Sequence, residues 1–131
     1  MATIHNNVQV QQFKATGDLS AQQYNVMRIN DGQDGVVVCS NAADPRMCGV
    51  LTNKPAASGR AAGVAYAGEY KARAGAAVSS TGMFLTVNGS GRVIVAGSGL
   101  MALGTNLETA AADGDLISVQ LMKPFQLGPL A

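Results

Sequence analysis

Charge, large aromatic side chains and histidine are all scarce in this sequence. Charged residues make up 13% of its 131 residues, about half the usual fraction. It has no Trp, three Tyr and three Phe. A core of small side chains such as Ala and Val buries little apolar surface per residue, at about 25 cal/mol per Å². We therefore expect association with copies or partners to contribute stability.

The few charges are also scattered. The formal net charge is +1, and the closest basic cluster is Lys71 with Arg73. Binding to a phosphate backbone needs several converging cations, so we expect no nucleic-acid partner. The opening MATIHNNVQVQQF is polar, and no run approaches the roughly 20 apolar residues of a membrane helix. We therefore expect no secretory signal, no membrane partner and a surface that is largely covered in the working state.

Catalytic groups are equally sparse. His5 is the single histidine and lies in the polar amino-terminal segment. No G-x-S-x-G elbow is present to hold a serine nucleophile. Catalysis needs titratable groups held close together, and this pattern supplies no such set. We expect no catalytic residues and no enzymatic activity.

The two cysteines, Cys39 and Cys48, lack the CxxC spacing of redox and metal sites. With His5 they make three possible metal ligands without a recognisable spacing, so we expect no metal. Strands joined by a short loop could bring the cysteines into a disulfide. Synthesis inside a cell favours the alternative, two free thiols that pack as small hydrophobes.

One acidic cluster needs an interpretation. Asp113 and Asp115 flank Gly114, and Glu108 lies upstream. Paired carboxylates can hydrolyse glycosides or bind calcium. Asp-Gly-Asp is also a common turn, and we favour a structural role in which these carboxylates accept backbone N–H bonds or face water.

Short β-branched segments separated by glycine turns dominate the chain. Residues 24–40 predict a hairpin around two Asp-Gly pairs, and residues 88–91 predict a second hairpin turn. The second turn lacks the Lys-Ser/Thr pair and the helix of a phosphate loop, so we expect no nucleotide cofactor. Residues 61–67 and 69–74 are predicted as two strands separated by Gly68. We expect an all-β small barrel or sandwich of eight to ten strands with little helix.

One strand–turn–strand pattern occurs twice. Residues 49–65 read GVLTNKPAASGRAAGVA, and residues 104–120 read GTNLETAAADGDLISVQ. The two align without a gap at Gly49 with Gly104, Ala56-Ala57 with Ala111-Ala112, Gly59 with Gly114, and Val64 with Val119. Five identities predict an internal repeat, although coincidence in a chain rich in Gly and Ala is the alternative. We expect the second copy to close the barrel at residues 116–122.

Composition divides the chain into three parts. Residues 1–15 are rich in Gln and Asn and are predicted to be an extended amino-terminal arm. Residues 16–123 are the β-barrel domain. Residues 124–131 form an apolar tail that we expect to pack on its own domain or on a neighbour, because exposed apolar chain ends are unfavourable in water.

Several of these segments together resemble the capsid cement, or head decoration, family of tailed bacteriophages. The resemblance covers about residues 15–122, and GVLTNKPAA at residues 49–57 is its most specific part. Weaker matching positions follow in order: Gly17 to Ser20, Gln23-Tyr24, Gly68, Ala74 to Val78, Gly91-Arg92, Leu103-Gly104, Leu107-Glu108 and Ala112 to Leu116. Residues 81–84, Thr-Gly-Met-Phe, depart from the family pattern.

The resemblance implies a non-enzymatic virion protein with a β-tulip-like or barrel fold. Such a protein is made in the host cytoplasm, binds the outer surface of the assembled head and bridges neighbouring major capsid subunits. It also implies self-association, as a trimer or alternatively a dimer. Phe13, Phe125, Leu127 and Leu130 are the predicted anchors to a neighbouring subunit or to the capsid. The competing functions are a carbohydrate- or small-ligand-binding β module on the virion surface and a hydrolase that uses the acidic cluster.

Overall fold

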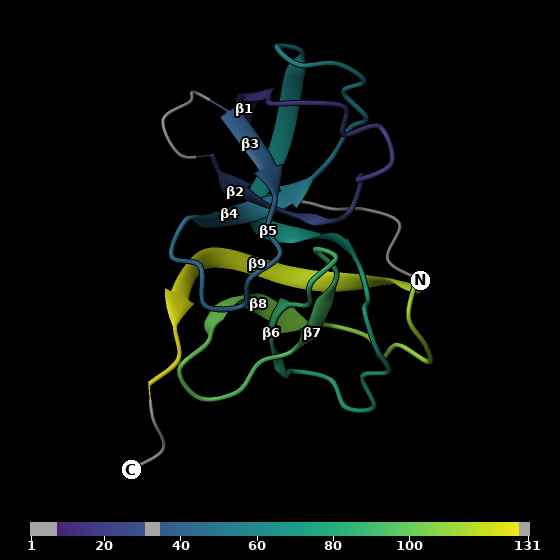
Figure 1. The fold of residues 1–131 in the computed structure, drawn as a ribbon. Coiled ribbons are helices and arrows are strands. Elements are labelled where there is room, and N and C mark those ends of the chain that lie inside the picture. Colours follow the sequence, from purple (N-terminus) through teal and green to yellow (C-terminus); the bar gives the residue numbers. More distant parts are fainter. Residues whose placement is uncertain (1–7, 31–34, 129–131) are drawn as a thin grey trace.

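The computed structural model describes residues 8–30 and 35–128, which form nine β-strands and no helix (Figure 1). The predicted all-β fold with eight to ten strands is therefore confirmed. The strands are β1 (Gln9–Ala15), β2 (Val26–Ile29), β3 (Gly35–Val38), β4 (Met47–Leu51), β5 (Ala61–Arg73), β6 (Phe84–Val87), β7 (Val93–Val95), β8 (Met101–Asn106) and β9 (Leu116–Gln126).

The first five strands close into a barrel, which we call the N-terminal barrel. Its strand order is β1-β3-β2-β4-β5, and β1 also pairs with β5. Closure removes the exposed sheet edges that an open sheet of this size would leave. Seven buried residues fill its interior: Ala15, Leu19, Met27, Val36, Leu51, Ala62 and Val64.

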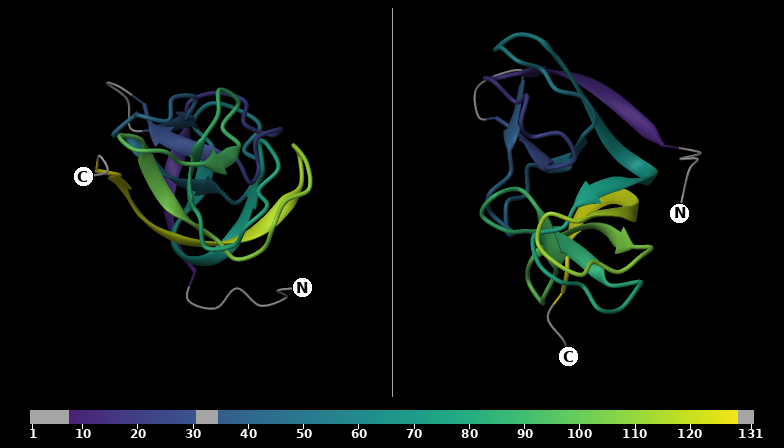
Figure 2. Two further views of the ribbon diagram at one scale, coloured as in Figure 1. Left: turned by 90° about the horizontal axis from the view of Figure 1, so that it is seen from below. Right: turned by 90° about the vertical axis from the view of Figure 1, so that its right-hand side faces the viewer.

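The remaining strands form a second unit, which we call the C-terminal unit, in the order β5-β9-β8-β6-β7. A parallel bridge between Ala74 and Val93 brings β7 back to the end of β5. The N–H of Gly75 donates to the carbonyl oxygen of Val93 beside this bridge (2.7 Å). Figure 2 shows the two units stacked, with β5 running from one into the other.

Strand β5 is shared by both units. Its first half pairs with β1 and β4, and its second half pairs with β9. The prediction of two strands separated by Gly68 was wrong, because the chain stays paired through that residue. Gly68 has a φ of +96°, a conformation that glycine adopts without steric cost, so it bends the strand without ending it.

The internal repeat is confirmed by the strand registers. In the first copy, Val50 pairs with Ala65 across β4 and β5. In the second copy, Thr105 pairs with Gln120 across β8 and β9. Both residues of the second pair lie 55 positions after those of the first. The two copies therefore have the same pairing as well as similar sequences.

The repeat extends well beyond these 17 residues. The N–H of Ala15 donates to Arg60 O, and the N–H of Gly59 donates back to Ala15 O. In the second copy, the N–H of Ala74 donates to Asp115 O, and the N–H of Gly114 donates back to Ala74 O. Strands β1 to β4 and the first half of β5 thus recur as the second half of β5 and β6 to β9. Strand β9 closes the second unit, whereas the prediction had it closing a single barrel.

Regular structure reaches past both predicted domain boundaries. Residues 9–15 form β1 inside the N-terminal barrel, and β9 continues to Gln126. Residues 1–7 of the predicted arm and 129–131 of the predicted tail lie outside the described residues.

Candidate interaction surfaces

The acidic cluster has the structural role that we predicted for it. Asp115 Oδ2 accepts hydrogen bonds from the N–H groups of Ala111 (2.8 Å) and Ala112 (3.1 Å). Glu108 Oε1 accepts from the N–H of Ser118 (2.7 Å). These bonds hold the turn before β9 and the start of that strand, and they engage one oxygen of each carboxylate.

The third carboxylate of the cluster, Asp113, forms an exposed ion pair. The guanidinium of Arg92 donates to Asp113 Oδ1 over 2.6 Å. The side chain of Asp113 is 60% exposed, so water screens the pair. This contact joins the turn between β6 and β7 to the turn before β9.

Both cysteines are free thiols, as favoured by the sequence. Cys39 is buried and its Sγ donates to Asn41 O (3.5 Å), while Cys48 Sγ lies 3.4 Å from Met27 O. Burial raises the pKa of the Cys48 thiol to about 12, with a smaller contribution from Cys39. The thiol is therefore protonated at neutral pH and a poor nucleophile.

Residues 8–30 and 35–128 contain no group of three or more His, Cys, Asp or Glu side chains able to hold a metal ion. They also contain no helix of the length and hydropathy that crossing a bilayer requires. His5 lies outside the described residues.

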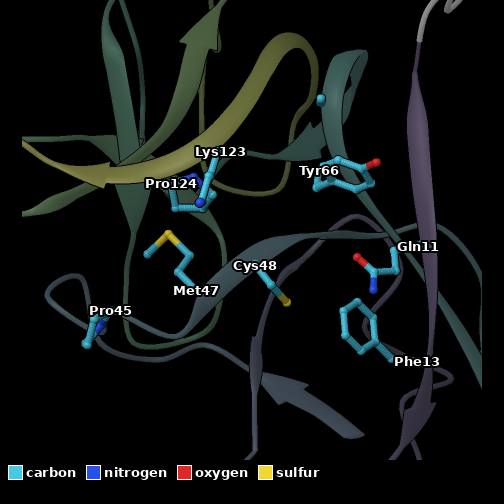
Figure 3. Close-up of a pocket in the computed structure, with 9 residues that line it drawn as sticks. Gln11, Phe13, Pro45, Met47, Cys48, Tyr66, Lys123 and Pro124 are labelled. Atoms are coloured by element: carbon cyan, nitrogen blue, oxygen red, sulfur yellow. The ribbon is translucent and has the colours of Figure 1, made fainter.

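A cleft of about 440 Å³ lies where β1, β4, β5 and β9 meet (Figure 3). Its lining is mostly apolar and comprises Gln11, Phe13, Pro45, Met47, Cys48, Tyr66, Ala67, Lys123 and Pro124. Tyr66 donates its hydroxyl hydrogen to Gln9 Oε1 (2.9 Å), which connects β5 to β1 beside the cleft. The sequence alone did not indicate this cleft, because its lining residues come from four strands and one loop that are separated in the chain.

The predicted interface residues lie at two separate places. Phe13 is half-buried at the cleft and packs against the core of the N-terminal barrel. Phe125 is exposed on β9, and Leu127 follows it, held by backbone bonds to Gly99 (2.9 Å) and Leu100 (2.8 Å). Leu130 lies outside the described residues. Of the three anchors that the structure describes, Phe13 lines the cleft, whereas Phe125 and Leu127 lie at the end of β9 outside the cleft lining.

Phe84 is a surface residue that the sequence reasoning missed. It packs edge-on against Phe125, with ring centroids 5.7 Å apart, and both rings stay about 40% exposed. The available signal was the departure from the family pattern at residues 81–84. Exposed aromatic pairs of this kind are typical of protein interfaces.

Comparisons with known proteins identify a fold. No protein-family profile matches the chain, and no curated protein matches it either. Among solved structures, the crystal structure of the head fiber gp8.5 N base from bacteriophage phi29 superposes with a TM-score of 0.62 at 16% sequence identity. The match covers 87% of this chain and 93% of that one. The chain thus has the fold of a bacteriophage head fiber base.

Proposed function

We propose that this protein is a structural, non-enzymatic component of a bacteriophage virion. It binds the outer surface of the assembled head and cements neighbouring major capsid subunits. The observation that carries the proposal is the likeness of its fold to the phi29 head fiber base over nearly the whole chain. The sequence resemblance to head decoration proteins over residues 15–122 supports the same role from a separate line of argument.

The site chemistry agrees with this role. The carboxylates that a hydrolase would use are engaged in turns and in one ion pair, and burial keeps the Cys48 thiol protonated. The exposed groups that remain prominent are apolar, notably Phe84 and Phe125. Apolar surface of this kind serves binding to another protein better than catalysis.

Cementing follows from binding linkage. A protein that binds only the assembled lattice stabilises it by RT ln(1 + [L]/Kd) per site, about 2.7 kcal/mol at a hundredfold excess over Kd. Self-association multiplies this effect, because several weak capsid contacts then engage together. Phe13, Phe125, Leu127 and Leu130 remain the proposed anchors, and the partners are the major capsid protein and further copies of this chain.

The decisive experiment is a binding assay on heads. Purified protein is mixed with undecorated expanded heads and, as a control, with unexpanded precursor heads. We expect saturable co-sedimentation with expanded heads, little with precursors, and a higher temperature of head disruption after decoration. Expanded heads that bind no protein at tens of micromolar would overturn the proposal.

A further inference from the structure

Because of the duplication, each sheet surface of the N-terminal barrel has a counterpart in the C-terminal unit. One such surface, which we call a wall, is covered in the N-terminal barrel, whereas its counterpart in the C-terminal unit is open. In the N-terminal barrel, Val26, Val50 and Ala65 lie on β2, β4 and β5 and point away from the interior of that barrel. They are nevertheless fully buried. They pack into the same apolar cluster as the core of the C-terminal unit, so the second unit covers this wall of the first.

The tip of the β6–β7 hairpin completes that cover. The N–H of Val26 donates to the carbonyl oxygen of Gly91 in the tip (2.8 Å). A Cβ on Gly91 would lie 2.5 Å from Val38 Cγ1, so the tip sits directly against β3. Tyr70, on the second half of β5, packs on the same cluster. The covered wall therefore ends in a close, specific contact with a hairpin turn.

The equivalent wall of the C-terminal unit is formed by β6, β7, β8 and β9, and we call it the end face. Strand registers and backbone bonds give five pairs of equivalent residues, the covered wall first in each pair: Val26 and Phe84, Val38 and Val95, Val50 and Thr105, Ala65 and Gln120, Tyr70 and Phe125. Phe84, Val95 and Phe125 are 41%, 40% and 39% exposed. A wall that is buried in one unit is thus open in the other.

Two side chains of the end face are larger than their counterparts on the covered wall, Phe84 in place of Val26 and Gln120 in place of Ala65. Phe84 replaces Val26, and its ring meets Phe125 edge-on. The two rings cover one another only in part, and about 40% of each side chain stays open to solvent. Aromatic side chains on an otherwise polar surface are the usual anchors of a protein–protein contact.

We propose that the end face is a self-association surface that binds the N-terminal barrel of a second copy of this chain. The C-terminal unit covers the equivalent wall, and the N-terminal barrel has the same strand arrangement, with β2 and β3 paired as β6 and β7 are. The backbone N–H of Asn30 donates to Gly35 O at the start of β3 (2.8 Å), and the backbone N–H of Asn88 donates to Arg92 O just before β7 (2.8 Å). A second copy therefore offers the structural counterpart of the unit already seen on this wall.

The resulting contact is heterologous, because it joins the carboxyl-terminal half of one copy to the amino-terminal half of the next. Heterologous contacts close into a ring when the rotation between copies allows it and otherwise extend into a filament. The inference details the proposed self-association and is independent of head binding. The free protein tests it, and heads do not enter the experiment.

The test is sedimentation of the full chain over a concentration series. Phe84→Ser and Gln120→Arg probe the end face. Leu116→Ser is the matched control, because Leu116 is 41% exposed and lies at the other end of β9 from Phe125. We expect oligomers for the unmodified chain and the control, and at least tenfold weaker association for both end-face variants. Gln120 is exposed, so Gln120→Arg tests the surface even if Phe84→Ser fails to fold.

A second measurement distinguishes this geometry from a symmetric contact. A tagged Gln120→Arg chain has a blocked end face but an intact N-terminal barrel, so the unmodified chain should still capture it. Tagged Gln120→Arg chains should not capture one another. A monomeric unmodified chain, end-face variants that associate as strongly as the control, or failure of the mixed capture would each overturn the proposal.

Discussion

Replacing Gly104 by Ala tests the duplicated core directly. A Cβ at this position would lie 2.2 Å from Gln120 O and 3.1 Å from Leu121 Cα, both backbone atoms of β9. An ordinary contact needs at least 3.4 Å, so β8 and β9 must separate by about 1 Å. The separation strains the pairing of Gly104 with Leu121 and leaves buried side chains on both strands less well packed.

The expected loss is about 3 kcal/mol, since overpacking alone costs roughly 1–3 kcal/mol and a weakened ladder hydrogen bond about 1 kcal/mol more. For a domain of this size, that corresponds to a Tm lower by roughly 12 °C. Gly49→Ala should cost as much or more, because its Cβ would lie 2.1 Å from Ala65 O and its φ is +152°.

Gly97→Ala is the matched control. A Cβ at Gly97 meets nothing within 4 Å, so we expect a change of no more than about 1 kcal/mol in either direction. Urea unfolding followed by circular dichroism measures all three variants. If Gly104→Ala were as stable as Gly97→Ala, the close approach of β8 to β9, and with it the equivalence of the two units, would be refuted.

Three further predictions concern buried or paired side chains. The pKa of the Cys48 thiol is about 12 in the folded state and 9.0 for the free group. The contribution of this thiol to the free energy of unfolding is therefore complete below pH 9 and is lost as the pH rises from 9 to about 12. Urea unfolding at pH 8 and pH 10.5 should show that loss in the unmodified chain and a smaller one in Cys48→Ala. Asn106→Leu should cost about 2–4 kcal/mol in urea unfolding, because the buried amide bonds to Ser80 O (2.7 Å), Glu108 O (3.1 Å) and the N–H of Met83 (2.8 Å); a stable variant would show that these groups find other partners. Asp113→Asn should change stability by less than about 1 kcal/mol at either low or high salt, and a larger loss would mean that its exposed ion pair is structural.

The sequence predicted local features well. The two hairpins were predictable because Asp-Gly and Asn-Gly turns determine them over a few residues, and β2 with β3 and β6 with β7 pair as expected. The repeat was visible because Gly49 and Gly104 each face a backbone carbonyl that leaves no room for a side chain.

Non-local features were beyond the same reasoning. A glycine such as Gly68 can end a strand or bend it, and the choice depends on whether β9 pairs with the residues that follow. Likewise, pairing of β1 with β5 joins residues about 50 positions apart, and no local pattern reports it. Phe84 is exposed because no second unit covers the end face, whereas the C-terminal unit covers the equivalent Val26. This difference depends on how the two units stack, which the sequence does not indicate.

Sharing of β5 between the units explains why two equivalent halves have different surfaces. A free-standing pair of identical barrels would expose the same wall twice. Fusion through one strand fixes their stacking, so the C-terminal unit seals Val26 while Phe84, at the equivalent position, stays open. The open wall is the surface that we propose binds a second copy, and it is also where β6 and β9 present contacting aromatic rings. Geometry and side-chain chemistry therefore indicate the same surface by independent routes.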